Sequence, residues 1–339
     1  MKSLCLPVLL LSVAGLGAAL PAAAQEPEKT IYERYTDPIE IYKTGLGTFR
    51  RPISSTNSEA QAFFNQGFQM MWAFAKPEAV RSFRESWKRD ADCAICYWGE
   101  AWAWGSYLNA PMSMEEGPHA YEAIQKARSL AAHASPKERA LIDAMSVRYV
   151  EHFDPNTRVE QDRAYAEAMR KLADTYPDDL DIVTLYGDAL FLLEPRRGSR
   201  DVNDPNVQRL HKVLESVLSR DVKHPGACHL YVHATESTVV PGRAEQCAEF
   251  LGSSIPGASH INHMPSHTWN EVGRWGDSVR ANLEAWHSDQ KAAIGEDSPS
   301  TRSTTSTCCS TRRRWTARAP SPCVRHGTTR SSPTTRRSR

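Results

Sequence analysis

The chain has 339 residues, 40% of them hydrophobic and 24% charged, so it is long enough to bury a sizeable core in one large domain or two ordinary ones. Its net charge of +1 conceals an uneven distribution. Ten arginines and no acidic residue follow Asp297, which leaves 31 basic against 40 acidic residues in 1–297, a net charge of −9. An acidic body lacks the clustered basic face that phosphate recognition needs, and we expect no nucleic-acid partner.

The first 24 residues have the layout of a secretory signal peptide. Lys2 precedes an apolar run from Leu4 to Leu20, and small residues up to Ala24 supply a cleavage site. The run contains Pro7 and is short for a membrane span. We therefore predict cleavage of residues 1–24, a periplasmic or secreted mature protein, and no membrane span.

A helical pattern occupies most of the remaining chain. From Ser58 to about Ala292, alanine-rich amphipathic stretches alternate with Pro, Gly and Asp at turn positions, and an alternating strand pattern hardly occurs. Ser58 and Gln61 have the spacing of a capping box at the start of the first helix. Residues 25–57 are expected to form an extended segment before it.

Small residues recur within this pattern at a spacing of 34, as between Gly67 and Ala101. A helix-turn-helix period of 34 with small residues at fixed positions resembles the tetratricopeptide repeat (TPR). The resemblance implies an all-α fold, a TPR-like right-handed α-solenoid of about six helix-turn-helix pairs in a repeat domain over 58–297. The pairs are expected at 58–91, 92–134, 136–177, 178–222, 225–256 and 257–292. The strings HLYVHATES and SHINHMPSHTWNEVGRWGD further resemble exported bacterial TPR proteins with a HINHMPSHTW-type histidine motif, a resemblance that implies no particular activity.

Four cysteines lie in the part of the chain that is expected to fold. Disulfides are the default in an exported protein, and Cys93 and Cys96 lack the adjacent histidine of a haem attachment motif, so we assign them a structural role. Cys228 and Cys247 fall on facing helices of the fifth pair, on the seam between them. We predict a disulfide between these two.

Residues 298–339 form a basic low-complexity tail rich in Ser, Thr, Arg and Pro. One explanation is a disordered tail. The other is a shifted reading frame. With one choice of codons for Arg302 to Thr316, dropping two bases yields VHNLHMLLYAASMD, which resembles a further repeat helix. We favour the frameshift because a solenoid needs a capping repeat, and resequencing the gene tests it.

Histidines cluster near the end of the repeat region. Five of the 12 fall within 39 residues: His229, His233, His260, His263 and His267. His229 and His233 stand three residues before and one residue after Val232. His263 and His267 stand at the same offsets from Ser266, so the two pairs occupy equivalent repeat positions. Pro265 starts or kinks the first helix of the sixth predicted pair, which leaves the placement of His260 and His263 open.

In the fifth predicted pair, the first helix carries His229 and His233 on a face away from the seam where it packs against the second helix. At about 100° per residue, His229, His233 and Glu236 share one face. In the fold that the chain resembles, this face lines a concave groove between helices about 8–10 Å apart. Neutral imidazoles from two helices predict a site for one transition metal ion, Zn, Cu, Fe or Ni, with Glu236 or His260 completing or orienting the shell. A bis-histidine haem is less favoured. Polar groove residues that contact a peptide, or a hydrogen-bonded network, are the alternatives.

The corresponding face of the earlier repeats is aromatic and apolar. It predicts a ligand groove lined by Phe64, Phe68, Met71, Trp72, Trp98, Trp102, Thr184 and Asp188. Such a pocket suits a small organic molecule beside a metal or polar centre. The alternative is that the aromatic rings form core against residues 25–57.

The predicted function is an exported TPR-repeat protein whose metal site binds or transforms a small organic molecule. The different-class alternative is a metal-free TPR scaffold that mediates peptide or protein-protein interaction. Glu236 and Asp188 are candidate catalytic bases. The sequence does not decide whether the protein is an enzyme.

Overall fold

The computed structural model describes residues 30–194 and 198–294, and over these ranges the chain is α-helical without a strand. The predicted all-α class is confirmed. The helices are α1 (Ile31–Thr36), α2 (Ser58–Trp72), α3 (Lys76–Arg89), α4 (Ala94–Trp104), α5 (Glu116–Ser129), α6 (Pro136–Ser146), α7 (Arg158–Thr175), α8 (Leu180–Phe191), α9 (Pro205–Leu218), α10 (Pro225–Thr235), α11 (Glu245–Ser254), α12 (Ser259–His263), α13 (Pro265–Glu271) and α14 (Trp275–Ala293), with short 3₁₀ turns η1 (Ala131–His133) and η2 (Pro241–Ala244). The predicted signal peptide and the basic tail lie outside the described residues.

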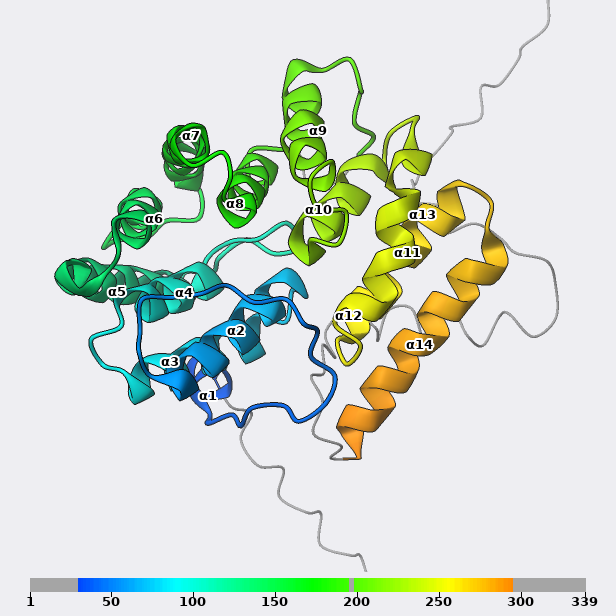
Figure 1. The fold of residues 1–339 in the computed structure, drawn as a ribbon. Helices are drawn as coiled ribbons and strands as arrows, with labels where there is room; N and C mark the ends of the chain where they lie inside the picture. Colours follow the sequence, from blue (N-terminus) through cyan, green and yellow to red (C-terminus); the bar gives the residue numbers. More distant parts are fainter. Residues whose placement is uncertain (1–29, 195–197, 295–339) are drawn as a thin grey trace, which may run out of the picture.

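Helices that follow one another in the chain pack against each other (Figure 1). α2 packs on α3, α4 on α5, α6 on α7, α8 on α9 and α10 on α11, and both α12 and α13 pack on α14. Each segment predicted as a helix pair therefore contains such a packed set. The chain also returns on itself, because α10 contacts α2. None of the described helices is long and apolar enough to cross a bilayer.

The sixth segment departs from a simple pair at Pro265. α12 ends at His263, and α13 begins at Pro265 after a single intervening residue. Proline is favoured in the first turn of a helix, where its missing N–H needs no partner, and it is disfavoured further inside. The break divides the later histidines between two short helices.

The start of α2 differs from the predicted capping box. The side chain of Asn57 caps the helix by accepting hydrogen bonds from the backbone N–H groups of Glu59 and Ala60, at 2.9 and 3.1 Å. Asparagine is as effective an N-cap as serine and stands one residue earlier than Ser58. Gln61 does not take part in the cap. Its Nε2 instead donates to the carbonyl of Arg51.

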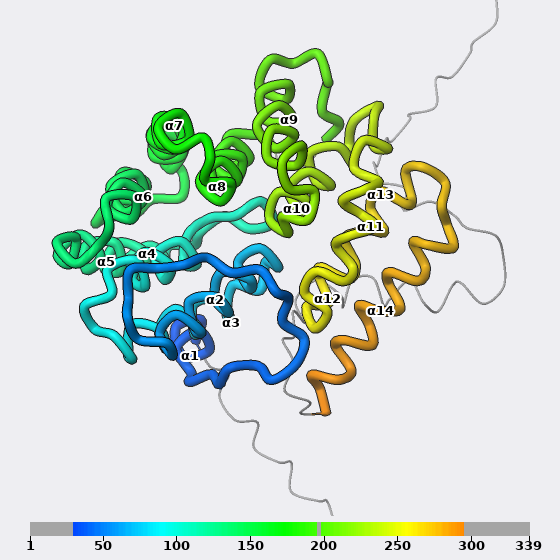
Figure 2. Tube along the Cα trace, viewed as in Figure 1, coloured from blue at the N-terminus to red at the C-terminus, as the bar shows by residue number. Residues whose placement is uncertain are grey.

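The segment before α2 crosses several elements (Figure 2). It is not extended throughout, since it contains α1. The backbone N–H of Gly257, just before α12, donates to the carbonyl of Gly45 at 2.9 Å. Arg51 forms an ion pair at 3.0 Å with Asp179, which precedes α8. The segment thereby joins the beginning of the chain to helices far along the sequence.

The predicted ligand groove is filled, and this prediction is corrected. The residues assigned to it are all buried, with at most 5% of their surface exposed: Phe64, Phe68, Met71, Trp72, Trp98, Trp102, Thr184 and Asp188. The ring of Phe68 lies 5.4 Å from that of Trp102 and 5.9 Å from Phe49 of the N-terminal segment, centroid to centroid. Rings from facing helices and residues before α2 occupy the space, so these positions form core.

Two disulfides close short stretches of the chain. Cys93 is bonded to Cys96 at the start of α4. Cys228 is bonded to Cys247, which places the predicted bridge between α10 and α11. The second disulfide ties α10 to α11.

Candidate metal centre

All five histidines predicted as ligands lie together, and Glu236 contacts two of them, His233 and His267. α10 supplies His229 and His233, α12 supplies His260 and His263, and α13 supplies His267. Neighbouring ring centroids are 4.9 Å apart between His229 and His260, 5.5 Å between His233 and His267, and 4.8 Å between His263 and His267. The two repeat-equivalent pairs therefore face a common region.

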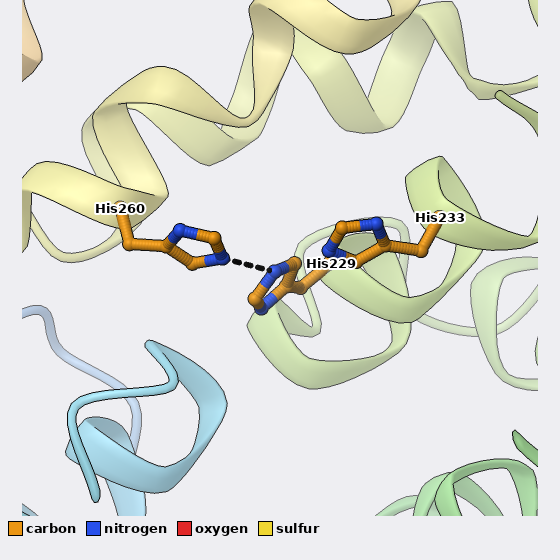
Figure 3. Close-up of side chains that lie close together, drawn as sticks. All are labelled: His229, His233 and His260. Carbon is orange, nitrogen blue, oxygen red and sulfur yellow. Dashed lines mark hydrogen bonds between the residues drawn. The ribbon is translucent and has the colours of Figure 1, made fainter. Parts of the chain in front are cut away.

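Three of these residues form a buried group that can hold a metal ion: His229, His233 and His260 (Figure 3). One nitrogen from each lies within 4.8 Å of the others, and no more than 4% of any of the three residues is exposed. The Nε2 atoms of His229 and His260 are 3.1 Å apart. Ligand nitrogens of a tetrahedral ion with bonds of about 2.0–2.1 Å lie about 3.3 Å apart, so this separation suits a shared ion.

The hydrogen bonds of two imidazoles determine which nitrogen carries the proton. Nδ1 of His229 lies 2.5 Å from the carbonyl oxygen of Trp72, and Nδ1 of His233 lies 3.0 Å from Oε1 of Glu236. Both oxygens are acceptors, so each Nδ1 donates and each Nε2 of a neutral ring keeps its lone pair. Nε2 of His233 is buried without a hydrogen-bond partner among the described residues. A lone pair in this position is available to a metal.

Glu236 connects the two histidine pairs. Its second oxygen, Oε2, accepts a short hydrogen bond from Nδ1 of His267. Burial alone would raise the pKa of Glu236, but the imidazoles of His267 and His233 hold it well below its ordinary value. A carboxylate that accepts from Nδ1 fixes the ring and directs Nε2 toward a metal. Glu236 thus orients histidines and has both oxygens occupied in doing so.

Burial keeps most of the cluster in the neutral form that binds metals. It lowers the pKa of His229 and of His260 well below 6.5, and the neighbouring imidazoles lower both further. It also lowers the pKa of His233, against the opposing effect of Glu236. His263 has its pKa lowered to about 4, mainly by burial. Neutral imidazole is the ligand form, so these rings need release no proton at neutral pH.

His267 differs from the others. Burial would lower its pKa, but Glu236 outweighs that effect and raises it. Nε2 of His267 lies 2.9 Å from Nε2 of His263, whose Nδ1 donates to Oδ1 of Asn282 at 2.8 Å. The amide nitrogen of Asn282 donates to the carbonyl of Ser278, which defines its oxygen as the acceptor. A protonated His267 therefore donates its Nε2–H to His263.

A cavity of about 230 Å³ lies next to the cluster. Its lining residues are Leu108, Asn109, Arg200, His233, Glu236, His260, His263 and His267. Two of the three residues of the buried group, His233 and His260, contribute to its wall. The cavity therefore adjoins the buried group.

Several residues of the site were not predicted from the sequence. Phe74 packs its ring 4.1 Å from His229 and 5.4 Å from His260, centroid to centroid. Its φ of 55° lies in the left-handed region, which costs a residue with a side chain about 1–2 kcal/mol. Strained backbone often occurs at functional sites. A phenylalanine in the sequence gives no indication of a left-handed backbone, so this feature could not be predicted. Trp72 contributes its backbone carbonyl, the acceptor for Nδ1 of His229. Every residue has such a carbonyl, so the sequence does not mark this position.

Asp188, the second candidate base, does not belong to this centre. It is buried on α8 and accepts a hydrogen bond from Nε1 of Trp102 at 3.4 Å. Burial raises its pKa to about 6, with Arg148 opposing the shift. Asp188 does not line the cavity beside the histidines. Its assignment to an open groove beside the metal is therefore corrected.

No protein-family model and no curated protein match this sequence. The chemistry of the histidines, Glu236 and the cavity is therefore the basis for assigning a function.

Proposed function

We propose that the protein binds one transition metal ion through Nε2 of His229, His233 and His260. The observation that carries this proposal is the buried Nε2 of His233, a lone pair without a partner among the described residues. Burying a polar atom without compensation is costly, and two further imidazole nitrogens lie within 4.8 Å. Neutral imidazoles suit Zn, Cu, Fe and Ni alike.

A metal ion with three protein ligands has a coordination position left for a further ligand, which is typical of a catalytic or ligand-binding site and not of a structural one. Structural zinc sites use four protein ligands, whereas catalytic sites use three and leave a position for water or substrate. The cavity beside His233 and His260 supplies space for such an occupant. We propose that the metal binds or transforms a small organic molecule there.

The wider setting of this function is also a proposal. We infer a TPR-like right-handed solenoid of helix pairs, exported to the periplasm or beyond after cleavage near Ala24. The packed helix pairs and the 34-residue spacing support the first inference, and the amino-terminal composition supports the second. The competing metal-free scaffold has less support, because the residues that would line its peptide groove are buried.

The test compares two histidine variants in protein purified without an affinity tag. The double variant His233→Ala with His260→Ala should retain no stoichiometric metal and should gain no thermal stability from added Zn, Cu, Ni or Fe(II). The wild type should gain about 2.7 kcal/mol of unfolding free energy at a free metal concentration 100 times Kd.

His211 supplies the matched control. It is a buried histidine on α9, 4% exposed, whose Nε2 lies 3.1 Å from the carbonyl of Ala234. His211→Ala should lower Tm and yet keep the metal. Wild-type protein that carries no metal and gains no stability from any of the four ions contradicts the proposal.

A further inference from the structure

A second pair of imidazoles, which the proposed ion does not use, borders the same cavity. His263 on α12 and His267 on α13 line the cavity of about 230 Å³, as His233 and His260 do. Their Nε2 atoms lie 2.9 Å apart. In the proposed site, Nε2 of His229 and Nε2 of His260 are separated by a similar 3.1 Å. The same approach of two ring nitrogens therefore occurs twice in the cluster.

The two rings of this second pair direct lone pairs at each other when they are neutral. Nδ1 of His263 donates to Oδ1 of Asn282, and Nδ1 of His267 donates to Oε2 of Glu236. A neutral imidazole with its proton on Nδ1 carries the lone pair on Nε2. Two lone pairs at this separation repel each other, so the pair needs a cation in contact with both nitrogens. That cation is a proton or a metal ion.

The spacing of the two nitrogens is close to that of ligands on one ion. Nitrogens bound to a tetrahedral ion at about 2.0–2.1 Å lie about 3.3 Å apart, so a separation wider by about 0.4 Å between His263 and His267 admits a metal. Both residues are partly exposed, and they lie on two short helices that meet at Pro265. A change of this size needs only a small rotation of the two rings.

Glu236 connects this pair to the proposed ion. One of its oxygens accepts from Nδ1 of His233, a proposed ligand, and the other accepts from Nδ1 of His267. A carboxylate that is hydrogen-bonded to a ligand of each of two ions places a negative charge near both. The repulsion between two neighbouring cations is thereby reduced.

Two protein ligands leave the second ion dependent on the cavity. A tetrahedral ion on His263 and His267 has two further coordination positions, and both residues line the cavity. In two-metal sites, both ions act on the oxygens of one bound molecule. An oxygen ligand in the cavity that binds the first ion can therefore complete the second. With two protein ligands against three, the second ion should bind after the first and more weakly.

We propose that Nε2 of His263 and Nε2 of His267 bind a second transition metal ion, so that two ions face the cavity. This inference rests on the proposed function, because the second ion shares a cavity ligand with the first. Protein as purified should carry the first ion, and titration should add the second.

The test is the zinc stoichiometry of the full chain, purified without an affinity tag, stripped with a chelator and titrated against a chromophoric chelator. The wild type should bind two equivalents, the second more weakly. His263→Ala should bind one. His263→Gln, which keeps a polar side chain at this position, should also bind one and serves if the alanine variant does not fold. His287→Ala, at an exposed position on α14, is the control that should keep two.

A wild type that binds only one equivalent would overturn the inference. A second equivalent that persists in both His263 variants, or that is lost in His287→Ala, would overturn it as well. The double variant His233→Ala with His260→Ala separates this result from the proposed function. If it abolishes a single wild-type equivalent, the first site stands and His263 shares a proton with His267. If the wild type binds no zinc, the proposed function fails and the second ion fails with it.

Discussion

Two faces of the molecule are equally buried: the aromatic face of α2 and α4, and the imidazole face of α10 and α12. They differ in how many polar atoms need a partner once they are buried. Trp102 is 1% exposed and His229 is 0% exposed. An aromatic ring buries mostly carbon, which needs only apolar contact, and the one polar group of Trp102, its indole N–H, donates to Asp188. An imidazole brings two nitrogens, and each needs a partner when it loses water. The same burial therefore stabilises one region and, in the other, leaves a group of imidazole nitrogens that could hold a metal ion.

The two regions are also joined directly. The carbonyl of Trp72, at the end of the aromatic helix α2, accepts from Nδ1 of His229 on α10. Phe74 then places its ring against the imidazoles. The aromatic region consequently orients His229, a proposed ligand, as well as supplying core.

The largest expected effect is on the aromatic side. Trp102→Ala should lower the free energy of unfolding by about 3–5 kcal/mol, since it leaves a large cavity in the core. The loss, measured by urea unfolding, should be the same for chelator-treated and metal-loaded protein. A loss that appears only in the presence of metal would show that the two regions are not energetically distinct.

A smaller effect concerns the buried carboxyl in the aromatic region. The pKa of Asp188 is raised by burial from 3.8 to about 6, so the folded state holds this proton more tightly than the unfolded state. Its contribution to stability is fully present below about pH 4 and is lost as pH rises through about 6, a change of at most about 3 kcal/mol.

Unfolding titrations between these pH values should show this loss in the wild type and a flatter profile in Asp188→Asn. Asp174→Asn on α7, where the carboxyl side chain is 67% exposed, should behave as the wild type does. A wild-type profile in Asp188→Asn would mean that Asp188 is not protonated in the fold.

The smallest predicted effect tests how Glu236 orients the ligands. A glutamine keeps one acceptor oxygen but presents an NH₂ group to the other histidine, so in Glu236→Gln either His233 or His267 loses the acceptor for its Nδ1–H. Metal affinity should fall 10–100-fold, as for other carboxylates that orient metal-bound histidines. Competition titration with a chromophoric chelator measures it.

Glu249→Gln is the comparison for this variant. Its carboxylate side chain is 62% exposed and pairs with Arg274 away from the cluster. It should leave the metal affinity unchanged. Equal affinities in wild type and Glu236→Gln would remove Glu236 from the orienting role.

The sequence predicts those features that periodicity or repeat position determines. Amphipathic spacing indicates the helices, and the equivalent offsets of His233 and His267 indicate that they approach each other. The path of residues before α2 has no such periodicity, so the sequence left two alternatives, an open groove or aromatic core packed against residues 25–57, without deciding between them. The cap at Asn57 was missed because several adjacent residues can cap a helix.

The partners of the imidazoles were also beyond prediction, for a different reason. Trp72 contributes a backbone carbonyl, and Asn282 contributes a side-chain amide from α14. Arg200, in the connection before α9, donates to the backbone carbonyl of His233 and not to its ring. Each contact joins residues far apart in the sequence, and only the packing of the helices brings them together.

The most direct test of the central claim is the metal content of protein purified without an affinity tag. Three buried imidazoles predict about one equivalent of Zn, Cu, Fe or Ni per chain by elemental analysis, and a lower Tm after removal of that metal with a chelator. Protein that contains none of these metals, and whose Tm none of them raises, would contradict the account and leave the histidines as a hydrogen-bonded network.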